Sequence, residues 1–254
     1  MKKPAMTTLR RVTLSSLAFP LALTLAACGG GTEEATVPEG DPIAAIAAPA
    51  GAEWGETAAL TPEGGYVIGN PDAPLKLVEY ASHTCSHCAD FSVAAAATLR
   101  DKYVASGVVS YEIRNLIRDP LDLTISTLAR CSGPQAFHPL AEQAWAQFGP
   151  IVEQANANQA AMAAAMEKTG PERFQAIGEA SGLIEFFAAR GLSRDQSMQC
   201  LADVDNITKI AQQSDKQSTE QNITGTPSFF LNGARLNMTT WDALEPVLQA
   251  AGAR

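Results

Sequence analysis

Short apolar runs separated by turn residues open the structured part of the chain. Residues 66–68 and 75–80 have the apolar and alternating character of β-strands, and residues 69–74 between them are rich in Gly, Asn, Asp and Pro. A helix-like apolar run follows at 85–103, and a third strand-like run at 108–116. This order predicts a β-α-β unit, the element that builds parallel sheets.

The apolar spacing then changes to three and four positions over residues 120–221, which are rich in Ala, Gln, Leu and Met and interrupted by Gly-Pro pairs. This spacing predicts several consecutive helices. Strand character returns at 228–231, and the Asn-Gly pair at 232–233 predicts a hairpin to 234–236. A last helix is expected over about 240–248.

The first residues have the pattern of an export signal. Four basic residues lie within the first eleven positions and precede a mostly apolar run, 12–27, that is too short for a comfortable membrane span. The run ends in Leu-Ala-Ala-Cys, which resembles the lipobox of bacterial lipoproteins. We therefore expect residues 1–27 to be a lipoprotein signal peptide and Cys28 to be lipidated. Ordinary signal cleavage, with Cys28 nearby by chance, is the alternative.

The net charge of the chain limits the classes of molecule that it is expected to bind. The whole chain has a formal net charge of −9, and removal of residues 1–27 leaves 14 basic against 27 acidic residues, a net charge of −13. Nucleic-acid binding is not expected of such a chain. Residues 28–64 are rich in Gly, Ala, Pro and Glu, contain no Lys or Arg, and are predicted to form a flexible tether.

Two cysteines three positions apart, Cys85 and Cys88, stand at the start of the helix-like run. This spacing permits a disulfide within one helical turn. The free amide groups of a helix N-terminus also stabilise a thiolate on the first cysteine. The pattern indicates redox chemistry, and an exported location suits disulfides.

The order of strand, Cys-x-x-Cys helix start, helical block and Gly225-Thr226-Pro227 resembles the DsbA-like thiol:disulfide oxidoreductases. The resemblance implies an α/β, thioredoxin-like fold with an inserted all-helical subdomain. Residues 65–118 and 222–254 would form the two parts of the thioredoxin fold, and residues 119–221 the helical insertion.

The resemblance also assigns roles within the motif. Cys85 matches the exposed nucleophile and Cys88 the buried resolving cysteine. His87 would donate a hydrogen bond or, when protonated, a charge to the thiolate; a solvated surface histidine is its alternative. Ser86 stands where the family often has proline, so the reduction potential is left open.

Thr226 and Pro227 match the loop that faces the disulfide in this family. The resemblance implies a cis peptide bond before Pro227, which sequence alone would not justify. The backbone of Thr226 would pair with an extended client peptide, and its hydroxyl could reach the active-site sulfur. A plain turn before a strand is the alternative.

Glu79 shares strand parity with Leu75 and Leu77, which places it on the side of the sheet expected to be buried. Burial would raise the pKa of this carboxyl group. It matches the buried acid of the family and could exchange a proton with Cys88. An edge-strand acid facing water is the alternative.

Cys131 and Cys200 lie 69 positions apart in the predicted helical insertion. A structural disulfide between them would stabilise the fold by about 4 kcal/mol through its effect on the unfolded chain. Two buried free thiols, or a second redox pair, are the alternatives. His138, in an apolar helical segment, is interpreted as a histidine at the edge of the core.

His83 and His87 lie close to the cysteines and raise the question of a zinc site. Two histidines and two cysteines within six consecutive residues give poor tetrahedral geometry for a metal ion, so we expect no metal site here.

Together these features predict a lipid-anchored periplasmic enzyme, at the inner or outer membrane, that introduces disulfides into reduced exported client proteins. No bound cofactor is expected, and the resemblance implies a DsbB-like, quinone-linked membrane oxidase as the partner that reoxidises it. A reductase or isomerase of the same fold remains a rival interpretation. A non-catalytic tethered binding or metal-carrying module is another.

Overall fold

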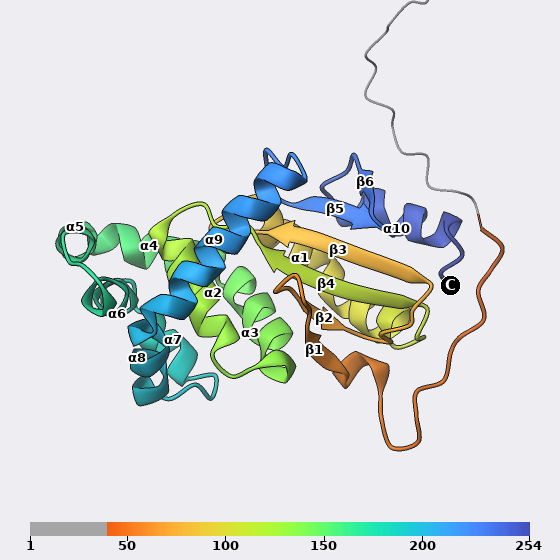
Figure 1. The fold of residues 1–254 in the computed structure, drawn as a ribbon, viewed down its shortest axis with the longest axis horizontal. Helices are drawn as coiled ribbons and strands as arrows, with labels where there is room; N and C mark the ends of the chain where they lie inside the picture. Colours follow the sequence, from red (N-terminus) through yellow and green to blue (C-terminus); the bar gives the residue numbers. More distant parts are fainter. Residues whose placement is uncertain (1–39) are drawn as a thin grey trace, which may run out of the picture. The chain divides into compact units, whose positions relative to one another are not determined.

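The computed structural model describes residues 40–254, and a mixed six-stranded sheet lies at their centre (Figure 1). Its order is β1-β2-β4-β3-β5-β6. Strands β3 and β4 are parallel, as predicted, and every other neighbouring pair is antiparallel. The strands are β1 (Ala58–Leu60), β2 (Tyr66–Ile68), β3 (Leu75–Ala81), β4 (Val109–Asn115), β5 (Ser228–Leu231) and β6 (Ala234–Leu236).

The parallel pair results from a crossover through helix α1 (Ser86–Thr98), which continues into the π-helical segment η2 (Leu99–Val104) before β4 begins. A crossover of this kind is how the chain returns to the same end of a sheet. Helix α1 packs with α10 (Trp241–Ala250) through one hydrophobic core, in which Phe91 lies 4.5 Å from Phe229 between ring centroids.

The segment between β4 and β5 is helical throughout, as predicted for the insertion (Figure 1). The helices of this segment are α2 (Pro120–Arg130), α3 (Pro134–Ala146), α4 (Phe148–Ala157), α5 (Gln159–Met166), α6 (Pro171–Ala180), α7 (Leu183–Ala188), α8 (Arg194–Ala202) and α9 (Val204–Glu220). Helices α3 and α6 each begin with a proline that directly follows a glycine with positive φ, Gly133 and Gly170.

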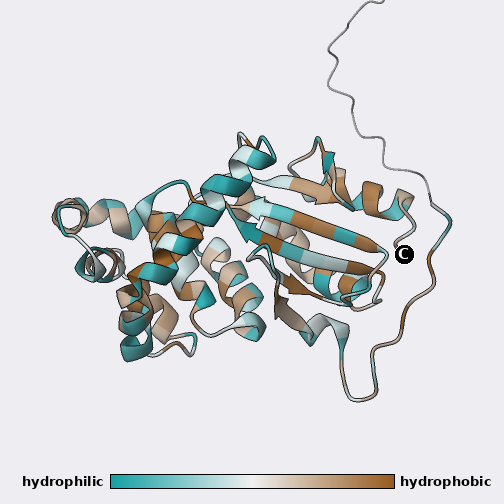
Figure 2. Cartoon of the chain, in the orientation of Figure 1, coloured by the Kyte–Doolittle hydropathy of each residue, from teal (hydrophilic) through white to brown (hydrophobic). Residues whose placement is uncertain are grey.

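Helix α9 returns the chain from this helical part to β5 and is buried along one side only. Its buried residues are Ile207, Ile210, Ser214 and Gln217, which recur at helical spacing. Figure 2 shows the corresponding mixture of hydrophilic and hydrophobic colour along α9. The Ser214 hydroxyl accepts a hydrogen bond of 2.8 Å from the backbone amide of Ile117, which fixes α9 beside the end of β4.

Residues 40–64 do not form the tether predicted for them. The backbone amide of Gly40 donates to the carbonyl of Ala250 at 2.8 Å, and that of Ile46 donates to Ser106 at 2.8 Å. The short helix η1 (Trp54–Glu56) and strand β1 follow, and β1 pairs with β2. The tether prediction is therefore wrong for this stretch, because a Gly- and Ala-rich composition does not reveal the backbone partners that another part of the chain offers.

The predicted signal peptide, Cys28 and the tether residues up to 39 lie outside the described residues. Among the helices of residues 40–254, none is both long and apolar enough to cross a membrane.

Candidate active site

Cys85 and Cys88 meet at the start of α1, directly beyond the carboxyl end of β3. Cys85 is the N-cap, with extended backbone angles, and Cys88 lies in the first turn. Both are free thiols, with exposed fractions of 4% and 0%. Cys88 is buried as predicted, but Cys85 is not the exposed cysteine that the resemblance implies, because the loop at Thr226 lies against its sulfur. Because the first amide groups of a helix have no partner within it, those of His87 and Cys88 are available to the Cys85 sulfur.

These surroundings shift the pKa values of the two thiols in opposite directions. The hydrogen bond from Cys88 lowers the pKa of Cys85 to about 5, against the opposing effect of burial. The side chain of Thr226 and the amides of Cys88 and His87 act in the same direction as that bond. Burial raises the pKa of Cys88 far above its ordinary value, assisted by its bond to Cys85 and by the charge of Glu79. At neutral pH the reduced site therefore holds one thiolate, on Cys85, and one thiol, on Cys88.

The loop before β5 lies against the same sulfur. In its thiol form Cys85 donates a hydrogen bond of 3.2 Å to the backbone carbonyl of Thr226. The Thr226–Pro227 peptide bond is cis, which confirms the prediction. The contact follows from the sheet, because β5 pairs with β3 and places Ser228 opposite Tyr80, next to the loop that leads to Cys85.

A shallow cleft of about 370 Å³ extends from Cys85 along this loop. Arg118 carries the only permanent charge among its lining residues, and the remainder of the lining is apolar or neutral. The lining brings the Cys85 sulfur next to the backbone carbonyl of Thr226, an arrangement that suits an extended peptide. The lining residues are Cys85, His87, Leu116, Arg118, Ser218, Ile223, Thr224, Gly225 and Thr226.

Glu79 lies beneath the thiols, on the central strand β3, with 1% of its surface exposed. The predicted burial is confirmed, and the edge-strand alternative is wrong because β3 has a neighbour on each side. Burial raises the pKa of this carboxyl group to about 8, although the Tyr111 hydroxyl donates a hydrogen bond to its Oε2 atom. Its Oε1 atom has no hydrogen-bond partner.

A buried aspartate that the sequence analysis did not single out holds the loop before Cys85. Asp122 of α2 accepts hydrogen bonds from the Ser82 hydroxyl at 2.6 Å and from the His83 backbone amide at 2.8 Å. Asp119, the N-cap of α2, accepts a further bond of 2.6 Å from the Thr84 hydroxyl. The approach to the dithiol is therefore fixed by the helical part of the chain. The Asp-Pro-x-x spacing indicates a helix start, but it gives no sign of this distant contact.

The two histidines flanking Cys85 point to different environments. His83 is buried, stacks on Trp145 with 4.7 Å between ring centroids, and lies 3.0 Å from the Ser126 hydroxyl through Nδ1. His87 is exposed and lines the cleft. Their side chains do not converge, and within residues 40–254 no three His, Cys, Asp or Glu side chains are grouped to hold a metal ion.

His138 lies deeper than predicted. It is 2% exposed, within the core rather than at its edge, and its Nε2 donates to the Tyr66 carbonyl at 2.8 Å. Burial lowers the pKa of this imidazole to about 4, so it is neutral at physiological pH. The prediction failed because α3 is covered on its apolar side by β1 and β2 as well as by α1.

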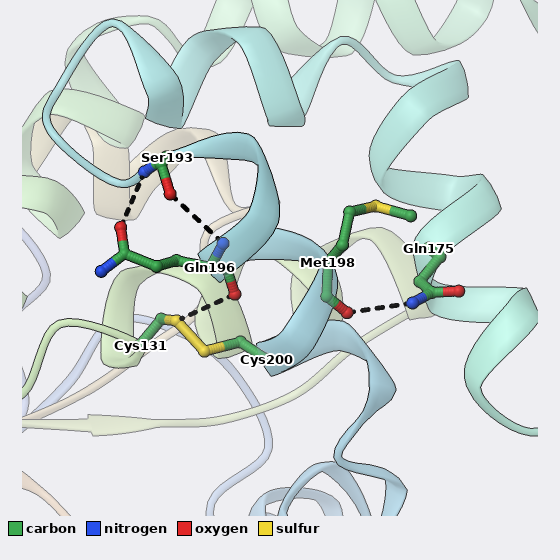
Figure 3. Close-up of a disulfide and its surroundings, with 6 residues drawn as sticks. All are labelled: Cys131, Gln175, Ser193, Gln196, Met198 and Cys200. Carbon is green, nitrogen blue, oxygen red and sulfur yellow. Dashed lines mark hydrogen bonds between the residues drawn. A yellow bond between two sulfur atoms is a disulfide. The ribbon is translucent and has the colours of Figure 1, made fainter.

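Cys131 and Cys200 form the predicted disulfide, with their Cα atoms 6.0 Å apart (Figure 3). The bond joins the end of α2 to α8. Figure 3 also shows how α8 is fixed at its start, where Ser193 and Gln196 form a reciprocal capping box. The disulfide thus closes the helical part, well separated in sequence from the free thiols.

Comparison with known proteins identifies the family. The family model described as thioredoxin matches residues 61–250. The structure of a protein-disulfide isomerase from Novosphingobium aromaticivorans is 30% identical with a TM-score of 0.69, covering 74% of this chain and 97% of that one. Alpha-DsbA1 of Wolbachia pipientis, 20% identical with a TM-score of 0.61, covers 76% and 94% and shares the fold.

Curated relatives are found in Rickettsia. A protein of Rickettsia bellii, provisionally assigned as a protein-disulfide oxidoreductase, is 27% identical over 194 residues, which is 74% of this chain and 65% of the relative. The chain thus spans less than two thirds of the length of this relative, and the same holds for the relative from Rickettsia typhi, at 61%. With the dithiol geometry, the matched family model shows that the chain belongs to the thioredoxin family.

Proposed function

We propose that this protein introduces disulfides into exported proteins by thiol-disulfide exchange, with Cys85 as the nucleophile. The observation that carries the proposal is the opposite shift of the two thiols. The pKa of Cys85 is lowered to about 5 by the bond from Cys88, while burial raises the pKa of Cys88. A stabilised thiolate favours the reduced protein, so its disulfide is a strong oxidant of other thiols.

The exchange proceeds in two steps. A client thiolate attacks the Cys85 sulfur, the Cys85–Cys88 bond breaks, and Cys88 takes the electron pair. A second client thiolate then attacks the client sulfur of the mixed disulfide, and Cys85 leaves as the thiolate that its surroundings stabilise. The client thereby loses two electrons, which the protein holds as a thiolate and a thiol.

Glu79 supplies the proton that the first step requires. A thiolate on Cys88 would be buried, and burial strongly disfavours its charge. A carboxyl group with a pKa of about 8, raised by burial, is still protonated at neutral pH and can give its proton to Cys88. We therefore assign Glu79 as the general acid of the forward reaction and the general base of its reverse.

The cleft beside Cys85 binds the client. The Thr226 carbonyl faces the Cys85 sulfur, so an extended client segment can pair with the backbone of this loop while its cysteine reaches Sγ. His87 lines the same cleft and is exposed, where it contacts the client rather than the buried part of the site.

A protein-disulfide isomerase is the second candidate, since a relative of 30% identity has that name. Reduction potential separates the candidates. Equilibration of the dithiol with glutathione buffers is expected to give a value near the ~−120 mV of DsbA rather than the ~−270 mV of thioredoxin. A value near the ~−180 mV of protein disulfide isomerase would favour the second candidate, and a value close to that of thioredoxin would refute the oxidase and favour a reductase.

The N-terminal sequence supports a location for this activity. The lipobox-like residues 25–28 suit attachment of Cys28 to a periplasmic membrane surface, where a DsbB-like, quinone-linked oxidase would regenerate the disulfide. Replacement of Cys28 by serine is expected to release the protein from the membrane fraction. Unchanged partitioning would contradict lipid attachment without affecting the redox proposal.

Trapping tests the whole proposal. A Cys88→Ala variant cannot resolve its mixed disulfides, so it should accumulate covalent adducts with several exported proteins on non-reducing gels. The matched control is Cys85→Ala, which retains the deeper thiol and should form none. Absence of adducts from Cys88→Ala would favour a non-catalytic binding module, and metal bound in stoichiometric amount would favour a metal carrier.

A further inference from the structure

Arg118 is brought beside the dithiol by the parallel pair of strands. Ala81 of β3 is registered with Asn115 of β4, so the residues three positions further on, Thr84 and Arg118, leave the same end of the sheet together. The Arg118 Nη1 atom donates a hydrogen bond of 3.4 Å to the carbonyl of Thr84, the residue directly before Cys85. Arg118 therefore lines the cleft that extends from Cys85.

The backbone that carries Arg118 is held from two sides. The Ile117 amide donates to the Ser214 hydroxyl of α9 at 2.8 Å, and the Arg118 amide donates to the buried Asp122 carboxylate of α2 at 3.0 Å. Both bonds use backbone amides, so a replacement of the Arg118 side chain leaves them in place. A charge on a fixed backbone costs less ordering when it binds a partner.

The Arg118 guanidinium is exposed and has no carboxylate partner among residues 40–254. The two acids that follow it in the sequence are engaged by other donors. Asp119 accepts a hydrogen bond of 2.6 Å from the Thr84 hydroxyl. Asp122 accepts one of 2.6 Å from the Ser82 hydroxyl. The charge of Arg118 is therefore available to a molecule that enters the cleft.

The chemistry of this part of the cleft suits a carboxylate. A guanidinium presents its N–H donors in a planar fork that matches two carboxylate oxygens. The contact with Thr84 places the Arg118 guanidinium about one residue from Cys85 along the chain. An extended client whose cysteine reaches Cys85 Sγ would thus bring residues one or two positions from that cysteine within reach of Arg118.

We propose that Arg118 selects client segments that have an acidic residue one or two positions from the reacting cysteine. The inference rests on the proposed function and names the class of client that its site prefers. The Arg118 guanidinium binds the client carboxylate, and it takes no electrons or protons in the exchange. Arg118 is therefore a residue that determines specificity.

A direct effect of Arg118 on the Cys85 thiolate is the competing interpretation. The hydrogen bonds that lower the pKa of Cys85 come from Cys88, Thr226 and the helix start, and among residues 40–254 none comes from Arg118. Loss of the arginine should therefore change which client is preferred and leave the pKa of Cys85 nearly unchanged.

The test uses the oxidised full chain and peptides with two cysteines, in which the residue beside each cysteine is Asp, Asn or Lys. One set of peptides is made for each of the four places within two positions of the cysteine. The second-order rate constant of peptide oxidation is measured at one fixed pH, because His87 lines the same cleft. Ratios between peptides are compared between variants, so that the intrinsic reactivity of each peptide thiol cancels.

The native ratio of the Asp peptide to the Asn peptide is expected to be about fivefold that of Arg118→Gln in at least one set. Added salt should reduce this difference, since the contact is between charges at the surface. Arg118→Glu should reverse the preference, favouring the Lys peptide over the Asp peptide by about the same factor relative to Arg118→Gln.

Arg173 of α6 provides a matched control. Its Nε atom donates a hydrogen bond of 2.7 Å to the Lys168 carbonyl, and it lies outside the lining of the cleft. Arg173→Gln removes the same charge and the same kind of bond from the helical part, so it should keep the native ratios.

The outcomes separate the two proposals. Equal ratios in the native protein, Arg118→Gln and Arg118→Glu in every set would refute the selection of acidic clients while leaving the exchange reaction in place. An equal loss of rate with all peptides, together with a raised pKa of Cys85, would overturn it in favour of an effect on the thiolate. A native protein that oxidises none of the peptides would contradict the proposed function, and the selection with it.

Discussion

The two cysteine pairs of this protein have opposite properties. Cys85 and Cys88 are separated by two residues and are free, with their thiols shifted in opposite directions. Cys131 and Cys200 are 69 positions apart and are joined in a disulfide between two helices. The first pair lies at a helix start beside a buried acid, and the second where α2 ends and meets α8.

The neighbours of each sulfur decide its chemistry in this protein. A helix N-terminus stabilises charge on Cys85, and burial prevents charge on Cys88. No titratable group is hydrogen-bonded to the second pair within the part of the chain that the structure describes; its contacts are to helix ends. The first pair is therefore suited to exchange, and the second to restricting the unfolded chain.

The largest effect should come from replacing the nucleophile. Cys85→Ser removes the thiolate that attacks and leaves, and it is expected to lower the rate of client oxidation by at least ~10⁴-fold. The measurement is oxidation of a dithiol peptide followed by fluorescence. A Cys131→Ser/Cys200→Ser double variant should keep its rate within about twofold of the native rate. A loss comparable to that of Cys85→Ser would contradict the assignment of exchange to the first pair alone.

The double variant should instead lose stability. Removal of a disulfide that closes a loop of 69 positions is expected to cost about 4 kcal/mol of unfolding free energy. Urea denaturation followed by circular dichroism measures it. Equal stability of the double variant and the native protein would show that the helical part holds itself together without the bond.

The titration of Glu79 should lower the free energy of unfolding as pH rises. Burial raises the pKa of this carboxyl group in the folded protein to about 8 from its ordinary value of 4.5. Below pH ~4 the carboxyl group is protonated in both the folded and the unfolded protein, so its titration does not change the free energy of unfolding. Between pH ~4.5 and ~8 the unfolded chain gives up its proton while the folded one retains it, so stability falls as pH rises.

Glu79→Gln removes this titration. The variant is expected to match the native protein near pH 4 and to exceed its unfolding free energy by ~4 kcal/mol near pH 8. Denaturation of both reduced proteins across this range measures the difference, in which the contribution of Cys85 cancels. A constant difference at all pH values would contradict the raised pKa.

The smallest effect should come from the loop that faces Cys85. The Thr226 side chain is one of several groups that lower the pKa of Cys85. Thr226→Val is expected to raise that pKa by less than about one unit, worth ~1 kcal/mol, and to make the disulfide a slightly weaker oxidant. Ultraviolet absorbance of the thiolate across a pH titration measures the shift. A pKa that falls would show that the hydroxyl opposes the thiolate.

Local patterns were sufficient to predict much of this molecule. Period-two alternation placed Glu79 on the buried face of β3, and a change to helical spacing marked the insertion. The position of Cys85 at a helix start followed from the strand that precedes it. The cis bond before Pro227 required the family resemblance, because the local sequence of Thr226 and Pro227 carries no such preference.

Contacts between distant segments could not be predicted in this way. Asp122 binds the loop at His83 across 39 positions, and Tyr111 reaches Glu79 across 32. Neither spacing leaves a periodic trace in the sequence. The order of residues 40–64 was missed for the same reason, since their partners include Ala250 and Ser106. The first two of these contacts belong to the polar surroundings of the dithiol.

The backbone hydrogen bond between Gly40 and Ala250 limits the distance between Cys28 and the folded domain. That contact and the one at Ile46 lie toward the end of the sheet where β3 begins, whereas Cys85 lies beyond the end where β3 finishes (Figure 1). If Cys28 carries a lipid as proposed, the twelve peptide units from Cys28 to Gly40 span at most about 40 Å. Cys85 would then lie at the end of the domain opposite the one at which Gly40 is bound.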